Sequence, residues 1–148
     1  MTNNEYINAY KKTQQSSNTV SSSHEIVRAL MKELINSMNK IVLDIQGDRK
    51  KEDLSILVNK NLKTEKALKK SKNFSKSLSI IYGLQTSLDF DKALEIATNL
   101  FQLYEYCRNE IIRGFSQKIE DGIIKAIDII KEIMNGWEEI PSLERKDG

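Results

Sequence analysis

The chain has 148 residues, of which 39% are hydrophobic and 30% charged, with a formal net charge of +2. This size and composition fit one soluble domain, and the single cysteine, Cys107, excludes an internal disulfide framework and a paired-cysteine metal site. No apolar run approaches the roughly 18 residues that span a membrane, and Met1 to Val20 is too polar for a signal peptide, so we expect a cytoplasmic protein without membrane insertion.

The first 21 residues are predicted to form a flexible N-terminal arm. They are rich in serine, threonine, asparagine and glutamine, and they lack a periodic apolar pattern. Such a segment has too little apolar surface to fold alone. Tyr6 and Tyr10 interrupt its polarity, so we expect these two side chains to tether the arm.

A first helix is expected from Ser22 to about Gly47. Ser22 followed by Glu25 is typical of a capping box, in which the two side chains satisfy backbone N–H groups at the start of a helix. The Gly47-Asp48 pair predicts its end. Apolar residues recur in between at helical spacing, namely Ile26, Leu30, Leu34, Met38, Ile41 and Ile45.

Residues 49–76 carry most of the positive charge. Ten basic and three acidic residues give this block a charge of +7, whereas residues 89–148 carry −5. The block is either a solvated helix face or a contact for an acidic partner or nucleic acid. Its one aromatic residue, Phe74, provides no base-stacking pattern, which favours the solvated face. Helical periodicity is weak over 49–71, and the boundary with the next helix is not evident from the pattern.

Three more helical stretches follow in the chain. A stripe from Phe74 to Leu88 is ended by Asp89-Phe90-Asp91, where Asp91 is placed to cap the next helix. That helix is predicted over Lys92 to Gly114. Its expected inner face comprises Leu94, Ala97, Leu100, Phe101, Tyr104, Cys107 and Ile111.

The last helix is expected from Glu120 to Glu139, and Pro141 follows it as a stop. No segment alternates with the period of two that marks a strand, and glycine is sparse. The pattern predicts an all-α fold, an antiparallel four-helix bundle over residues 22–141 with a short tail at 142–148.

The predicted helices carry more apolar surface than a bundle core requires. A core stripe takes about a third of a helix's circumference. On the third helix, Ile96, Leu103 and Ile112 widen the stripe, and Tyr106 lies further out. Two interpretations stay open at this point: half-buried edges of an ordinary core, or a groove for an amphipathic partner segment.

Residues suited to catalysis are few. The one histidine, His24, lies in the first turn of a predicted helix, and Cys107 has no histidine near it in sequence and lies on a core face. The chain has no HExxH motif, no glycine-rich phosphate loop and no serine elbow. We therefore expect neither an enzyme nor a bound metal or cofactor, and we expect Trp137 to pack in the core.

Five sequence blocks resemble, in order, the FliS family of flagellar secretion chaperones. The blocks are Ala9-Tyr10-Lys11-Lys12; Ser22-Ser23-His24-Glu25-Ile26 with Leu30-Met31; Ile80-Ile81-Tyr82-Gly83-Leu84-Gln85-Thr86-Ser87-Leu88-Asp89; Asn99-Leu100 with Leu103-Tyr104-Glu105-Tyr106; and Gly136-Trp137-Glu138-Glu139-Ile140-Pro141. The chain departs from the family at Ser23, Ala93-Leu94 and Glu110, and it is longer than the family between Met38 and Phe74. The departures predict a lengthened first hairpin in the family's bundle.

The resemblance implies a chaperone that binds the C-terminal segment of flagellin, one to one, in an apolar groove. It implies that flagellin is kept from polymerising before export, with the type III flagellar export gate and flagellar regulatory proteins as further partners. Tyr10 is the expected plug of the empty groove. The expected groove residues are Ile26, Leu30, Ile80, Leu84, Leu103, Tyr104 and Tyr106.

Core packing is the alternative role for Leu30, Leu84 and Tyr104. In the sharpest form of the prediction, Leu103 and Tyr106 are partly exposed beside a groove, while Leu100, Tyr104 and Cys107 face the core. The rival function is a generic helical adaptor or nucleic-acid-binding bundle that uses the lysine-rich residues 49–76. That function predicts strongly salt-dependent binding of DNA or RNA.

Overall fold

The computed structural model describes residues 20–50 and 60–138, with side chains over 24–49 and 64–137. Tyr10 and the rest of the predicted arm up to residue 19, and the tail at 142–148, lie outside the described residues. The described part contains four helices and no strand.

The first helix, α3, spans Val20–Lys50 and is longer than the sequence signals predict. It begins before Ser22, so the predicted N-cap lies inside the helix, and it continues through Gly47. A glycine inside a helix costs about 0.5–1 kcal/mol relative to alanine. Ile45, one turn earlier, is buried, and Asp48 forms an ion pair with Lys70 of the next helix. These tertiary contacts explain why the helix does not stop at Gly47.

The second helix, α4, spans Lys60–Thr86 and joins the lysine-rich stretch to the apolar stripe that begins at Phe74. Lysine, leucine and alanine are good helix formers, and no glycine or proline interrupts residues 60–82. The boundary left open within this stretch does not exist in the structure. At its end, Thr86 Oγ1 and Ser87 Oγ donate to backbone carbonyls of the last turn.

The third helix, α5, spans Leu94–Gln117, and the turn before it is stabilised by Asp89 rather than Asp91. Asp89 Oδ1 accepts hydrogen bonds from the backbone N–H groups of Asp91 and Lys92 at 3.0 and 3.2 Å. Ala93 occupies the N-cap position without a side-chain hydrogen bond. The predicted capping role of Asp91 is therefore wrong, because α5 begins at Leu94 and Ala93, two residues after Asp91, occupies the N-cap position.

The fourth helix, α6, spans Asp121–Glu138, close to the predicted bounds. The connection before it is tight. Lys118 adopts a left-handed conformation with φ of 57°, and its N–H donates to Gly114 O. A Cβ added at Gly114 would lie 2.6 Å from Ile119 O and from a methyl carbon of Ile123. Gly114 therefore lies inside α5, not at its end as predicted, and permits this close approach.

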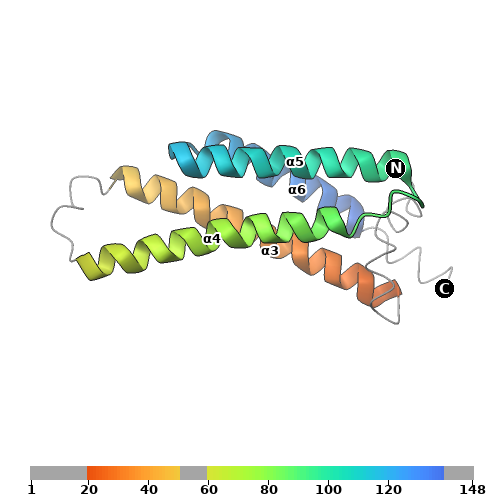
Figure 1. Ribbon diagram of the computed structural model, residues 1–148, viewed down its shortest axis with the longest axis horizontal. Helices are drawn as coiled ribbons and strands as arrows, with labels where there is room; N and C mark the ends of the chain where they lie inside the picture. The colour runs from red at the N-terminus through yellow and green to blue at the C-terminus, as the bar shows by residue number, and fades with distance from the viewer. Residues whose placement is uncertain (1–19, 51–59, 139–148) are drawn as a thin grey trace.

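Successive helices run in opposite directions, as Figure 1 shows: α3 and α5 run one way, α4 and α6 the other. Neighbouring helices pack against each other around one core. The predicted antiparallel four-helix bundle is confirmed, and α3 and α4 are its longest helices with 31 and 27 residues. None of the described helices is long and apolar enough to cross a membrane.

The inner face of α3 differs from the expected one. Val27, Met31 and Ile35 are buried, although none of them belongs to the apolar stripe expected from the sequence. Ile26, placed on that stripe, is 43% exposed, and Leu30 is half-buried. The apolar sector of α3 is wider than the core requires. The bundle therefore buries the edge that carries Val27, Met31 and Ile35 and leaves the edge that carries Ile26 near solvent.

Candidate functional site

An open apolar hollow lies between α5 and α6. Its volume is about 510 Å³, and no charged residue lines it. We call it the α5–α6 hollow. It is lined by Asn99, Gln102, Leu103, Tyr106 and Ile129.

The hollow forms because α5 has two adjacent faces. Residues three and four apart lie on one side of a helix, and Asn99, Leu103 and Tyr106 follow this spacing. The neighbouring face carries Leu100 and Tyr104, which are fully buried in the core. The first strip therefore lies at the edge of the bundle, and Ile129 of α6 completes the wall opposite.

The lining combines an apolar floor with a polar rim. Leu103 and Ile129 are half-buried and pack against the core, whereas Tyr106 is 41% exposed. Asn99 and Gln102 are exposed and present side-chain amides that can donate and accept hydrogen bonds. Such a surface can take apolar side chains from a partner while the amides pair with that partner's backbone.

The predicted groove residues fall into three groups. Leu103 and Tyr106 line the α5–α6 hollow as partly exposed side chains, and Leu100, Tyr104 and Cys107 are fully buried, as the sharpest form of the prediction requires. Ile26 and Leu30 lie on α3 and do not line this hollow. Tyr10 lies outside the described residues.

Three of the expected groove residues do not line the hollow, because they belong to the hydrophobic core: Ile80, Leu84 and Tyr104. Leu84 and Tyr104 have no exposed surface, and Ile80 is 8% exposed. Tyr104 follows Leu100 by one helical turn on the inward face of α5. This burial conflicts with the expectation that these side chains line a groove. For Leu84 and Tyr104 it agrees with the alternative stated above, a role in core packing.

Three lining residues were not predicted: Asn99, Gln102 and Ile129. Asn99 and Gln102 could have been predicted from the sequence, because they share the i, i+3, i+4, i+7 spacing of one helix face with Leu103 and Tyr106. Ile129 was not, because it lies at the edge of an α6 stripe whose centre is formed by Ile123, Ile127 and Ile130. Only the pairing of α5 with α6 makes it face the hollow.

His24 connects the start of α3 to the end of α6. Its ring stacks on Trp137 with centroids 4.9 Å apart, and its Nε2 lies 2.8 Å from Trp137 O. Trp137 Nε1 donates in return to His24 O at 2.9 Å. Both residues are buried, so this reciprocal pair is a structural clasp between two helix ends, and Trp137 packs in the core as predicted.

Cys107 is an inert core residue. Burial raises the pKa of its thiol to about 12, and the negative charge of Glu110 adds to this shift. Its Sγ lies 3.7 Å from Ala126 O. A thiol with so high a pKa is neutral at physiological pH and a poor nucleophile. Within the described residues, no group of histidine, cysteine, aspartate and glutamate side chains is placed to hold a metal ion.

Comparison with known proteins identifies the family. A family model described as "Flagellar protein FliS" matches residues 6–144. The chain is 30% identical over 136 residues to a flagellar secretion chaperone FliS of Vibrio cholerae, which covers 91% of this chain and 88% of the relative. It is 32% identical over 72 residues to a flagellar secretion chaperone FliS of Salmonella typhimurium, which covers 48% of this chain and 53% of the relative. The helical bundle and the matches over most of its length agree: this chain belongs to the FliS family of flagellar secretion chaperones.

Proposed function

We propose that this protein is a cytoplasmic chaperone that binds the C-terminal segment of flagellin in the α5–α6 hollow, one to one. The observation that carries the proposal is an open, uncharged, apolar hollow on a member of a flagellar chaperone family. Covering the apolar face of flagellin prevents premature polymerisation by competition, and the loaded chaperone supports export through the flagellar secretion system.

The chemistry of the hollow suits a segment that folds as it binds. Apolar surface that the segment buries against the hollow contributes about 25 cal/mol per Å². Ordering a disordered segment costs about 2–5 kcal/mol of this. The balance gives a complex that is stable during storage and still releases flagellin at the export apparatus.

A matched pair of substitutions tests the site. Tyr106 and Ile124 are 41% and 40% exposed and lie on α5 and α6, but only Tyr106 lines the hollow. Tyr106→Asp places a charge against the bound apolar segment, so we expect it to weaken binding about tenfold or more. Ile124→Asp should leave binding unchanged. The measurement is isothermal titration calorimetry with the C-terminal segment of flagellin from the same organism.

Leu103→Asp provides a second variant, and its fold is checked by circular dichroism because Leu103 packs against the core. Equal binding by wild type, Tyr106→Asp and Leu103→Asp would exclude the hollow as the site. Failure of the wild type to bind any flagellin segment would exclude the proposed client. Tight, salt-dependent binding of DNA or RNA instead would favour the lysine-rich adaptor.

The predicted arm plug is tested separately. If Tyr10 occupies part of the client site in the free protein, removal of residues 1–10 relieves competition. We expect the shortened chain to keep its helical content and to bind the flagellin segment as tightly as the full chain or more tightly. A weaker complex would mean that the arm contributes contacts to the client and is not a plug.

A further inference from the structure

The first part of α4 projects from the bundle with little packing against it. Residues 64–69 are all exposed, including Ala67 and Leu68, and α4 reaches past the end of α5 in Figure 1. Helices in proteins are stabilised mostly by packing of an apolar face. Residues 64–69 contribute little to such packing, so their side chains can contact a partner protein.

Positive charge dominates this extension. Between residues 64 and 76, α4 carries five lysines and one acidic residue, Glu65. Lys70 pairs with Asp48, and Lys76 with Glu33. Lys66, Lys69 and Lys72 form no ion pair within the described residues. The ammonium groups of these three lysines can therefore pair with carboxylates of an acidic partner.

Two of these lysines, Lys66 and Lys69, border a second hollow, between α3 and α4, with a volume of about 340 Å³. Leu43 in its wall is 65% exposed. Gly47, one turn further along α3, has nothing within 4 Å of the position of a Cβ, which leaves space beside the leucine. We call this the basic α3–α4 surface. It is lined by Leu43, Asp44, Gly47, Asp48, Lys66, Lys69 and Lys70.

We propose that the basic α3–α4 surface binds an acidic, amphipathic helical segment of a partner protein. Leu43 takes an apolar side chain of that segment, and Lys66 and Lys69 pair with carboxylates beside it. Nucleic acid fits less well, because no aromatic residue lines the hollow for base stacking.

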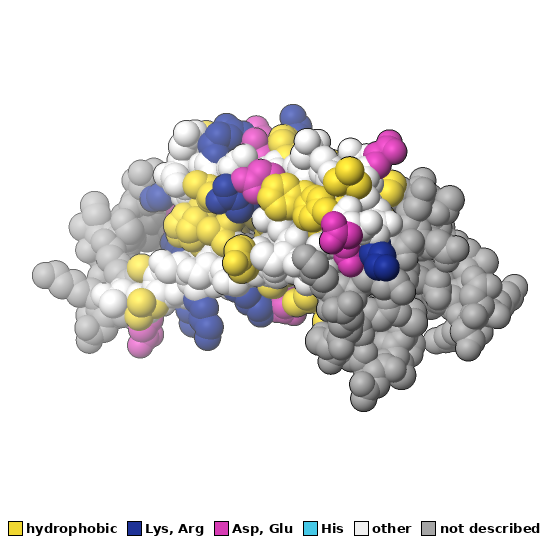
Figure 2. Space-filling model, turned by 45° about the vertical axis from the view of Figure 1, so that its right-hand side comes forward, with side chains coloured by type: hydrophobic (Ala, Val, Ile, Leu, Met, Phe, Trp, Pro, Cys, Tyr) yellow, Lys and Arg dark blue, Asp and Glu magenta, His cyan; other side chains and the backbone are white. Residues whose placement is uncertain are grey.

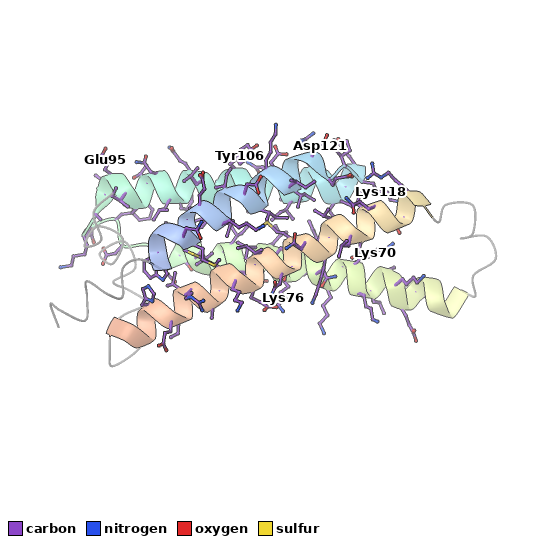
Figure 3. All side chains as sticks on the ribbon, turned by 180° about the vertical axis from the view of Figure 1, so that it is seen from behind. Lys70, Lys76, Glu95, Tyr106, Lys118 and Asp121 are labelled. Carbon is purple, nitrogen blue, oxygen red and sulfur yellow. The ribbon has the colours of Figure 1, made fainter. Side chains whose placement is uncertain are left out.

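The surface is separate from the α5–α6 hollow. Figure 3 places Tyr106 on one side of the bundle and Lys70 and Lys76 on the other, and the two linings share no residue. Figure 2 shows lysine and arginine side chains at the upper and lower edges of this face, with hydrophobic side chains gathered between them. Both surfaces can be occupied at once, so this proposal does not rest on the flagellin site.

The test uses a labelled helical peptide of about three heptads, with leucines on one face and glutamates beside them, in fluorescence anisotropy with the full chain. We expect Lys66→Glu with Lys69→Glu to weaken binding about tenfold or more, since two attractive pairs become repulsive. The control is Lys92→Glu with Lys131→Glu, which changes net charge equally at exposed positions away from this surface. It should bind within about twofold of wild type, because the shared change in net charge acts weakly at this distance.

Two further comparisons define the contact. Leu43→Ser should weaken peptide binding about threefold or more, and a peptide with serine in place of leucine should bind wild type weakly. Equal losses in the two charge-reversed chains would overturn the proposal. So would a single-stranded RNA that binds the wild type more tightly than the peptide does. Calorimetry with the flagellin segment should be unaffected by Lys66→Glu with Lys69→Glu, which separates this proposal from the preceding one.

Discussion

The α5–α6 side of the bundle and the projecting start of α4 differ in how their residues meet solvent. On α5, the residues at one face are fully buried, and the next face lines an uncharged hollow. On α4, the side chains of residues 64–69 are all exposed, and the charges are mostly lysine. Stability therefore resides where α5 and α6 pack into the core, whereas the extension of α4 contributes charge and reach at little cost to the fold.

The largest expected effect comes from truncating one leucine in each region. Leu100 is fully buried on α5, and Leu68 is 65% exposed on α4. Leu100→Ala should lower the free energy of unfolding by about 2–5 kcal/mol, through lost burial and the cavity left behind. Leu68→Ala should change it by less than about 0.5 kcal/mol. Urea denaturation followed by circular dichroism measures both.

Comparable losses of unfolding free energy in Leu100→Ala and Leu68→Ala would contradict this difference between the two regions, because they would mean that the start of α4 packs as tightly as the core. An unchanged urea dependence of the unfolding free energy is the control. It shows that both variants unfold from a native state of the same compactness.

Substitution of alanine for Gly114 on α5 and for Gly47 on α3 should change stability in opposite directions. Gly114→Ala forces a Cβ to within 2.6 Å of Ile119 O, so we expect a loss of about 1–2 kcal/mol after the gain in helix propensity. Gly47→Ala meets nothing within 4 Å and should stabilise α3 by about 0.5–1 kcal/mol. Thermal unfolding of the two variants beside wild type gives the two signs directly. A lower melting temperature for Gly47→Ala would contradict the open space beside Gly47.

The fold was largely predictable from the sequence because helical periodicity extends over most of the chain. The helix ends were less so. Gly47 and Ser22 carry local signals for an end and a cap, but the energy of packing against α4 and α6 exceeds the cost of ignoring them. The prediction for Asp91 failed for another reason: Asp89 stabilises a turn over residues 89–92, and α5 begins only at Leu94, beyond the reach of an N-cap at Asp91. Local capping and helix-end signals in the sequence therefore do not fix a helix end where tertiary packing or another nearby residue determines it.

The candidate site was predictable on α5 and not elsewhere. Leu103 and Tyr106 lie off the centre of a strong stripe, so their exposure follows from the sequence of one helix. Ile80 and Leu84 are buried, and the sequence left core packing open for Leu84, because a single helix does not reveal which neighbour covers it. Ile129 was missed for the same reason, since only the geometry of α5 beside α6 brings it to the hollow.

A smaller effect is expected at the clasp between α3 and α6. Trp137→Phe keeps an aromatic ring beside His24 but removes the Nε1–H that donates to His24 O. We expect a loss of about 1 kcal/mol, typical of one buried hydrogen bond. Tyr82→Phe, which removes an exposed hydroxyl on α4, is the matched control and should have no effect. Guanidinium denaturation resolves the difference, and equal values would mean that the clasp contributes only packing.

The smallest effect concerns acid stability. Hydrogen bonds from Arg108 and then Gln85 hold the pKa of Glu105 below its usual value. A lowered pKa in the folded state stabilises the fold above the unfolded pKa of about 4.3, and this contribution is lost as pH falls through the folded pKa. Because Glu105 is partly exposed, its contribution is a few tenths of a kcal/mol. Glu105→Gln should therefore be slightly less stable than wild type at neutral pH, and this difference should vanish once pH has fallen below the folded pKa of Glu105, as measured by urea midpoints. A difference that persisted in acid would assign the effect to packing of α4 against α5 and not to charge.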